Sequence, residues 1–307
     1  MIDKKARQKE DPDRYADKHL LQHEAVCVGK KIGIFHELPT GYKLQLSSWS
    51  GKKAVSGPIM KQPERQVEKL SVVLPTYNEK DNIAPLISEI LKHVSLETEI
   101  IVVDDDSPDG TWQIVENLAL ENPAIKLIRR TDQRGLVSAL NDGIAASTGK
   151  CVAWMDCDLS MPPAHLKDLI RKIEAGHDAA VASRFIQGGG VEILTGSGDT
   201  VLAFLLSRTL NRFIRTMLDS SFFDYTSGFI VIRKQALADT PLKGDYGEYF
   251  IELIHRIKKK GFKTVEIPYI CRARKAGQSK TGTNIFHYLK KGIKYIAVIL
   301  SLKIKNK

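Results

Sequence analysis

The chain has 307 residues with a formal net charge of +10, and 43% of them are hydrophobic, which is ordinary for a soluble globular protein of one large or two small domains. The charge is uneven, because residues 1–69 carry +5, residues 70–257 carry −8 and residues 258–307 carry +13. The basic C-terminus lies beside an apolar stretch and lacks interleaved aromatic residues, so it indicates a membrane surface as partner and not nucleic acid.

Cysteine spacing and the residues near the two ends of the chain lead to further expectations. The four cysteines form no CxxC pair and show no zinc-like spacing, so we expect a reducing, cytoplasmic compartment. The N-terminus lacks the apolar segment of a signal peptide. The longest apolar stretch near the C-terminus, 295–302, is far shorter than the ~20 residues that cross a bilayer, so we expect no spanning helix.

In chain order, residues 1–69 are polar and poorly periodic, and we assign them no function beyond a short hairpin predicted at 42–49. From residue 70, buried-type strands alternate with helices. Strands are predicted at 71–75, 99–104, 125–128 and 151–156, and helices at 83–94, 110–122 and 136–146. This alternation predicts an α/β fold, with a mostly parallel sheet covered by helices on both faces.

The second half is less regular. Strands are predicted at 179–183, 229–232 and 264–270, helices at 200–218 and 248–259, and an amphipathic segment at 285–304. We therefore divide the chain into an N-terminal extension, 1–69, a main domain, 70–282, and a basic C-terminal segment, 283–307.

The most informative motif is the pair Asp156 and Asp158 at the end of the strand predicted at 151–156. Where the chain leaves a sheet, both carboxylates can turn towards one ligand. Such oxygen ligands suit Mg²⁺ or Mn²⁺, which keeps waters and takes phosphate oxygens as its other ligands. A solvated turn is the alternative, because Asp-x-Asp is common by chance.

Three other segments also follow predicted strands. In parallel sheets, ligands bind beyond the carboxyl ends of the strands, so these segments are candidate parts of the site. In 75–79, Tyr77 can stack on a base and Glu79 can accept hydrogen bonds from a nucleoside. In 104–109, three adjacent carboxylates repel one another, so ligand binding or helix capping must offset that cost. The basic loop 272–280 can approach a diphosphate.

Six spaced motifs resemble one family. They are Val72-Val-Leu-Pro-Thr-Tyr-Asn-Glu79, Ile101-Val-Val-Asp-Asp-Asp-Ser-Pro-Asp-Gly-Thr111, Met155-Asp-Cys-Asp-Leu-Ser160, Ser183-Arg-Phe185, Thr226-Ser-Gly-Phe229 and Arg274-Lys-Ala-Gly-Gln-Ser-Lys280. Together they resemble a GT-A fold, family 2 glycosyltransferase of the dolichol-phosphate (polyprenyl-phosphate) mannose synthase type. The resemblance covers about residues 70–282 and does not extend to 1–69.

The resemblance implies a role for each matching residue in the donor site. The nucleoside of the sugar donor would be held by Pro75, Tyr77, Glu79, Val102 and Asp104. The divalent ion would be bound by Asp156 and Asp158, with Met155 and Cys157 lining the donor site and Arg274 and Lys280 clamping the diphosphate.

The acceptor phosphate would, by the same resemblance, face Arg184, Ser207 and Arg208. The residues expected to be catalytic are Asp156, Asp158, Arg184 and Arg274. Two departures from some relatives matter: Ser160 replaces a glutamine, and Ala203 replaces an arginine one turn before Ser207, which weakens the acceptor assignment.

The implied activity is inverting, metal-dependent transfer of a hexose, for which we expect mannose from GDP-mannose, onto polyprenyl or dolichyl phosphate. A lipid phosphate is already anionic and needs no general base, whereas a neutral hydroxyl acceptor would need one, and Asp224 is the candidate. A Gln-x-x-Arg-Trp run is absent, which argues against polymerisation. The alternatives are a UDP-glucose or UDP-GlcNAc transferase acting on a lipid phosphate or a polysaccharide hydroxyl, and a non-catalytic nucleotide-sugar or membrane-binding scaffold.

The C-terminal segment has two readings. Phe286, Leu289, Ile293, Ile296 and Leu300 form one face, which either packs on the domain or lies in a membrane interface. The second reading predicts a peripheral protein on the cytosolic face of a membrane. Related enzymes often add transmembrane helices after this point, so a membrane partner subunit is a further expectation.

Overall fold

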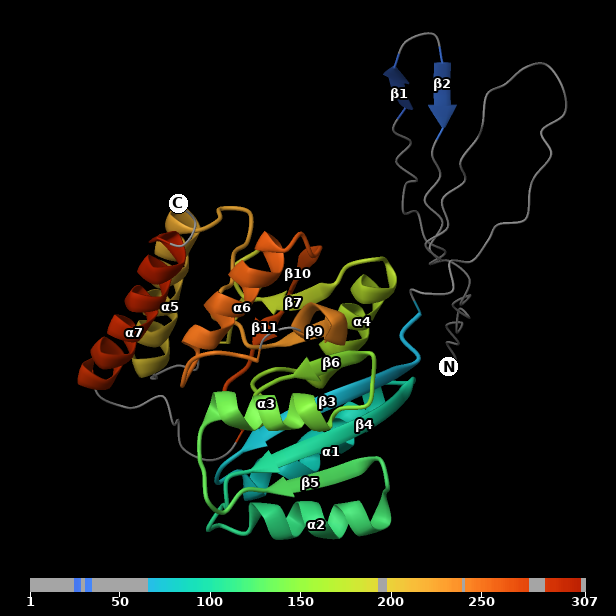
Figure 1. Cartoon of the computed structure of the whole chain (residues 1–307), viewed down its shortest axis with the longest axis vertical. Coiled ribbons are helices and arrows are strands. Elements are labelled where there is room, and N and C mark those ends of the chain that lie inside the picture. The colour runs from blue at the N-terminus through green and yellow to red at the C-terminus, as the bar shows by residue number, and fades with distance from the viewer. Residues whose placement is uncertain are drawn as a thin grey trace, which may run out of the picture. The chain divides into compact units, whose positions relative to one another are not determined.

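The computed structural model describes residues 25–28, 31–34, 66–192, 198–238, 241–275 and 285–304 (Figure 1). Side chains at 25–28, 31–34, 198–200, 202–203 and 285–291 are outside the description. The chain divides into two compact units, Met1–Gln62 and Pro63–Lys307. In the first, β1 (Ala25–Val28) and β2 (Lys31–Ile34) form an antiparallel pair. The hairpin predicted at 42–49 lies outside the described residues.

The second unit is built on a seven-stranded sheet with the order β10-β7-β9-β6-β3-β4-β5. Strand β9 runs antiparallel to both β6 and β7, and the other pairs are parallel, so the prediction of a mostly parallel sheet is confirmed. The strands of the sheet are β3 (Lys69–Thr76), β4 (Glu97–Asp104), β5 (Ile125–Arg129), β6 (Cys151–Trp154), β7 (Ala179–Ser183), β9 (Ile230–Arg233) and β10 (Thr264–Pro268).

Helices cover both faces of this sheet, as the alternating pattern predicted. The helices are α1 (Lys80–His93), α2 (Thr111–Glu121), α3 (Leu136–Ala146), α4 (Leu166–Glu174), α5 (Gly198–Met217), α6 (Glu248–Lys259) and α7 (Ile285–Ile304). Short 3₁₀ turns lie at Pro163–His165 and Lys234–Leu237. Helix α4 is an element that the sequence analysis did not predict.

Strand residues alternate between two hydrophobic cores. Leu70, Val72 and Leu74 of β3 pack with residues of α1, α2 and α4, whereas Val73 packs on the opposite face with residues of α3 and α6. Successive side chains of a strand point to opposite faces, so a strand that is apolar at nearly every position must be covered twice. The rigid sheet then presents the carboxyl ends of β3, β4 and β6 side by side.

Two predicted strands differ from the structure at their ends. Strand β6 ends at Trp154, not at residue 156, so both aspartates of the Asp-x-Asp pair lie in the turn that follows. The strand predicted at 264–270 ends at Pro268, and Ile270–Cys271 instead forms a separate strand, β11, parallel to β8 (Gly190–Val191). Proline lacks the N–H that would continue the ladder past Pro268.

Helix α7 lies beside α5 at the edge of the second unit (Figure 1). Its Tyr295, Ile299 and Leu302 pack into the core, whereas Ile293, Ile296 and Leu300 are exposed. The reading in which the latter three pack on the domain is therefore wrong. Phe286 and Leu289 lie among the undescribed side chains. Among the described residues, no helix has the length and apolar character needed to cross a bilayer.

Candidate active site at the carboxyl ends of β3, β4 and β6

The loops that follow β3 and β4 are joined by hydrogen bonds from main chain to side chain. The backbone N–H of Asn78 donates to Ser107 Oγ at 3.0 Å, and that of Glu79 donates to Thr111 Oγ1 at 2.9 Å. The backbone N–H of Lys80 donates to Asp109 Oδ2 at 3.1 Å. These contacts fix Glu79 at the start of α1, although this residue is far in sequence from the second loop.

Each of the three adjacent carboxylates has its own compensating partner. Asp104 is fully buried and accepts hydrogen bonds from Thr76 and Ser107, and Asp105 pairs with buried Arg130. Asp106 accepts two from Arg129. Their mutual repulsion is therefore offset within the protein itself, and the run needs no ligand for that purpose.

Backbone strain occurs in all three loops at this edge of the sheet. Asn78, Asp106 and Leu159 have φ of 55°, 54° and 62°, and they are the non-glycine residues with positive φ among the described parts of the chain. Such a conformation costs free energy for a side chain larger than glycine and collects at functional sites. One such residue follows each of β3, β4 and β6.

The turn after β6 is held against the segment that follows β11. The backbone N–H of Arg272 donates to the carbonyl of Ser160 at 2.8 Å, and that of Lys275 donates to the carbonyl of Asp158 at 3.2 Å. The start of the predicted basic loop therefore lies on the Asp-x-Asp turn. Lys280, the other predicted diphosphate ligand, lies outside the described residues.

Arg274 connects two predicted site residues from different strands. Its Nη2 lies 2.9 Å from Asp158 Oδ2, and its Nη1 lies 3.4 Å from Glu79 Oε1. Asp158 also accepts a hydrogen bond from the backbone N–H of Ser160 at 3.0 Å. The structure thus brings together Glu79, Asp158 and Arg274, which come from three of the segments predicted to lie beyond the carboxyl ends of the strands.

Asp156, unlike the buried Asp158, is an exposed residue of this turn. The protein packed around its carboxylate and the charge of Asp158 raise its pKa, whereas Arg274 and Arg184 act in the opposite direction. A carboxylate whose charged form is destabilised by a neighbouring carboxylate fits a divalent cation, which would relieve that repulsion.

The donor set fits Mg²⁺ or Mn²⁺ better than a metal enclosed by protein. No cluster of three or more His, Cys, Asp or Glu side chains able to hold a metal occurs among the residues that the structure describes. An ion at Asp156 and Asp158 would therefore take its other ligands from water and from phosphate oxygens. This is the usual coordination of Mg²⁺ beside a nucleotide.

Several predicted site residues are buried. Val102, Met155 and Cys157 belong to the core on the α1 side of the sheet, and the Cys157 thiol faces the Pro75 carbonyl at 3.4 Å. Their side chains support the loops, and Pro75 itself is half-buried. Direct contact of these four residues with a nucleoside stays a prediction.

Arg134 is a residue that the sequence analysis missed. Its guanidinium carbon lies 4.9 Å from the centre of the Tyr77 ring, and its Nη1 donates to the Tyr77 hydroxyl at 3.2 Å. A cation that stacks on an aromatic ring fixes the position of that ring. The sequence offers only a weak signal for this role, namely an arginine before Gly135 at the start of a predicted helix.

Arg184, the residue that follows β7, is held by several hydrogen bonds. Its Nε and Nη2 donate to the two oxygens of fully buried Asp224 at 2.9 and 2.8 Å, and Nη2 also donates to Thr226. Burial alone would lower the pKa of Arg184, but Asp224 outweighs this effect and raises it. Both oxygens of Asp224 are engaged, so it is not placed as a free base.

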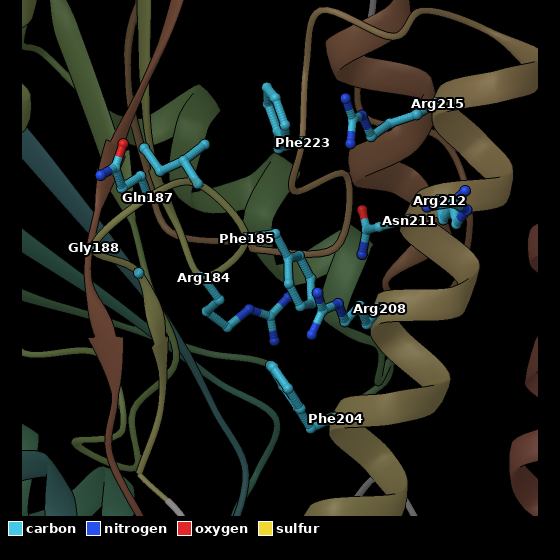
Figure 2. A pocket seen from close by; sticks show the side chains of 12 residues that line it. Arg184, Phe185, Gln187, Gly188, Phe204, Arg208, Asn211, Arg212, Arg215 and Phe223 are labelled. Carbon is cyan, nitrogen blue, oxygen red and sulfur yellow. The ribbon is translucent and has the colours of Figure 1, made fainter.

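A cavity of about 430 Å³ lies between Arg184 and helix α5. Among the residues described around it, four arginines and no acidic residue line it: Arg184, Arg208, Arg212 and Arg215. In Figure 2, Arg208 projects from α5 towards Arg184. Ser207 is not one of the lining residues, and its hydroxyl lies 3.0 Å from that of Thr226. An anionic group is what such a lining would bind.

The mostly parallel sheet with helices on both faces, together with the acidic turn after β6, defines a GT-A glycosyltransferase fold. The chain belongs to glycosyl transferase family 2, whose sequence model matches residues 71–240.

Two curated relatives match most of the chain. The dolichol-phosphate mannosyltransferase of Pyrococcus furiosus is 37% identical over 72% of this chain and 62% of its own length. The chain therefore spans less than two thirds of that relative. The polyprenol monophosphomannose synthase of Mycolicibacterium smegmatis is 34% identical over 72% of this chain and 84% of its own length.

Two solved structures share the fold. Glucosyl-3-phosphoglycerate synthase from Mycobacterium tuberculosis, in complex with Mn²⁺, UDP and glucosyl-3-phosphoglycerate, superposes with a TM-score of 0.56 and 21% identity, covering 76% of this chain and 80% of that one. A mannosyltransferase from Pyrobaculum calidifontis, in complex with GDP-Man and Mn²⁺, gives 0.53 and 17%, covering 79% and 66%.

Proposed function

We propose that this protein transfers mannose from GDP-mannose to polyprenyl or dolichyl phosphate, with inversion at the anomeric carbon and with Mg²⁺ or Mn²⁺. One observation carries the proposal: the acidic turn of Asp156 and Asp158 is linked to a cavity whose charged lining residues, among those the structure describes, are all arginines. The link is the segment 269–275, in which the backbone N–H of Tyr269 donates to the Ser183 carbonyl, next to Arg184, and that of Lys275 donates to the Asp158 carbonyl. Arg184 itself lines the cavity. A metal-dependent donor site and an anion site therefore adjoin.

The donor half of the proposal rests on the first site. Asp156 and Asp158 would hold the ion, which, when bound, neutralises charge on the departing diphosphate. Arg274 forms an ion pair with Asp158, and its guanidinium would contact the same phosphate oxygens when the donor binds. Such groups stabilise charge where it develops during reaction. Tyr77, supported by Arg134, and Glu79 are offered as nucleoside contacts.

The acceptor half rests on the cavity. Arg184 is fixed by Asp224, whereas Arg208 is exposed and points towards it (Figure 2). A phosphate monoester between the two guanidinium groups would present an anionic oxygen, so no residue needs to remove a proton. This agrees with the engagement of Asp224, whose two carboxylate oxygens both accept hydrogen bonds from Arg184.

The names of the two curated relatives support mannose and a polyprenyl phosphate over the alternatives. The Pyrobaculum structure with GDP-Man and the Mycobacterium structure with UDP are likenesses of fold and do not choose between the bases. A panel of radiolabelled nucleotide-sugars, each with and without polyprenyl phosphate, tests the donor. GDP-mannose turnover that depends on the lipid phosphate supports the proposal, and turnover of a UDP-sugar alone overturns it.

Replacement of Asp158 by alanine separates an enzyme from a scaffold. An enzyme loses metal-dependent turnover while the protein stays folded. A scaffold that only binds nucleotide-sugars or membranes would show no turnover in either form, and that result would reject the proposal.

The exposed face of α7 supports a peripheral place at a membrane. Ile293, Ile296, Leu300 and Ile304 recur along one side of this helix, and Lys294 and Lys303 flank them. The same proposal includes two finer points: the protein lies on the cytosolic face of the membrane, and a membrane protein serves as its partner subunit. Binding to vesicles with anionic lipids, lost in an Ile296→Glu variant with unchanged turnover of a soluble acceptor, tests it; equal binding by both forms contradicts it.

A further inference from the structure

One face of α5 changes character along its length. Val201, Phe204, Leu205 and Arg208 are spaced i, i+3, i+4 and i+7, and so lie on one side of the helix. Arg208, Arg212 and Arg215 continue the same side in the next turns. The N-terminal half of this face is therefore apolar, and the C-terminal half is cationic.

The change from apolar to cationic falls at the cavity. Figure 2 shows Phe204, Arg208 and Arg215 projecting from α5 to the cavity side, with Phe204 below Arg208 and Arg184. The rings of Phe185 and Phe204 lie 5.6 Å apart between centres, and the Arg184 guanidinium carbon lies 5.2 Å from the centre of the Phe185 ring. Aromatic and cationic groups thus share one cavity wall.

The apolar half continues outside the cavity. Leu205 is 52% exposed and Val201 is 36% exposed. Val201 lies before Phe204 and Leu205 lies directly after it, on the same helix face. Residues 201 and 208 are about 10 Å apart along the helix axis. Exposed apolar side chains in line with a charged pocket match a ligand that is anionic at one end and apolar along its tail.

We propose that this face of α5 orients the acceptor lipid, with its phosphate at Arg208 and its first isoprenoid units running over Phe204, Leu205 and Val201 towards the N-terminus of the helix. The inference rests on the proposed function, because it assumes a prenyl phosphate acceptor. It assigns to Leu205 and Val201 a specificity role, since they would separate lipid phosphates from water-soluble ones. The chemistry at the phosphate does not depend on them.

The helix offers a matched control. Leu206 is 42% exposed, close to the value for Leu205, but it lies on a different side of α5. Leu205→Gln and Leu206→Gln remove the same apolar surface from neighbouring positions. Neither side chain is buried, so both variants are expected to fold.

The test uses soluble acceptors without membranes or detergent: dimethylallyl phosphate, which has a single isoprenoid unit, and the longer farnesyl phosphate. For the wild type, kcat/KM should be higher with farnesyl phosphate. Leu205→Gln should lower kcat/KM for farnesyl phosphate about tenfold, the size expected for one apolar side chain against a ligand. It should leave the value for dimethylallyl phosphate and the KM for GDP-mannose unchanged, as should Leu206→Gln for both acceptors. Val201→Gln should repeat the Leu205→Gln pattern.

Failure of the inference differs from failure of the proposed function. If the wild type turns over farnesyl phosphate but Leu205→Gln and Leu206→Gln behave alike, the orientation on α5 is wrong and the function stands. If Leu205→Gln acts only when the acceptor is embedded in vesicles, this face contacts the membrane and the inference is again overturned. If the wild type uses no prenyl phosphate, both fall.

Discussion

Arg274 and Asp158 form an ion pair of 2.9 Å between a segment near the C-terminal end of the second unit and the turn that follows β6. The backbone of the next residue, Lys275, donates to the Asp158 carbonyl. The start of the basic loop and the acidic turn are therefore in direct contact, and the guanidinium of Arg274 lies beside Asp158. A diphosphate and a metal ion would separate these charges and use both.

Replacement of Arg274 by alanine should make the protein less efficient in using the nucleotide-sugar donor. Because its guanidinium would stabilise charge on the diphosphate, we expect kcat/KM for the nucleotide-sugar to fall roughly a hundredfold. The matched control is Arg272→Ala, since Arg272 is exposed and its interaction with the acidic turn uses its backbone N–H. Steady-state kinetics with both variants checks this, and equal losses would contradict a specific role for Arg274.

Loss of Arg184 should damage the fold as well as the acceptor site. Arg184→Ala leaves the carboxylate of Asp224 buried without its partner, so the free energy of unfolding should fall by about 3 kcal/mol. Arg208→Ala, at an exposed arginine of the same cavity, should change stability little and raise the KM for the acceptor. Urea unfolding separates the two, and similar unfolding midpoints for both variants would be inconsistent with a buried pair.

A second buried carboxylate sets an acid limit on stability. Burial alone would raise the pKa of Glu99, but hydrogen bonds from Lys126, Ser71 and Thr148 outweigh it and lower the pKa to about 2. Since this pKa lies below the value of 4.5 for an unperturbed glutamate, the contribution is complete above pH 4.5 and is lost as the pH falls towards 2.

Glu99→Gln should therefore destabilise the protein at pH 7 by at most about 3 kcal/mol, and the difference from the wild type should shrink in acid. Unfolding curves measured between pH 7 and pH 3 check this. A difference that stays constant over that range would show that the charge of Glu99 is not responsible.

Two helical glycines should respond in opposite ways to alanine. A Cβ at Gly143 in α3 would lie 2.3 Å from Val73 Cγ1 of β3, so the helix packs on the sheet only because the side chain is absent. Overpacking of this kind costs about 1–3 kcal/mol. At Gly292 in α7 nothing lies within 4 Å, and Gly292→Ala should stabilise by about 0.5–1 kcal/mol. Thermal unfolding of the two variants measures both signs, and destabilisation by Gly292→Ala would reject this account of α7.

Much of the fold follows from local patterns in the sequence. Strand β3 is apolar at most positions, and this predicted a strand buried on both faces, with Val72 and Val73 in opposite cores. Helix α3 has the bounds that were predicted, 136–146. Helix α4 was missed because its buried Leu166, Leu169, Ile170 and Ile173 follow a proline-rich turn, which obscures the start of the periodic pattern.

The residues of the site also form two groups: those that the sequence predicted and those that only the structure reveals. Side chains that follow strands were predicted from position, and Glu79, Asp158 and Arg274 do meet. The pairing of Arg184 with Asp224, and of Arg134 with Tyr77, depends on contacts between segments far apart in the chain. No local pattern encodes these contacts. The exposed side of α7 was ambiguous for a related reason: an amphipathic pattern gives a helix two faces without saying which one the domain covers.

The most direct test of the account is the position of Mn²⁺ in crystals of the protein with GDP-mannose or GDP. The account predicts an anomalous peak within coordination distance, about 2.0–2.3 Å, of carboxylate oxygens of both Asp156 and Asp158, and on the diphosphate as well. A nucleotide bound beside Tyr77 and Arg274 with no Mn²⁺ at the two aspartates would contradict it.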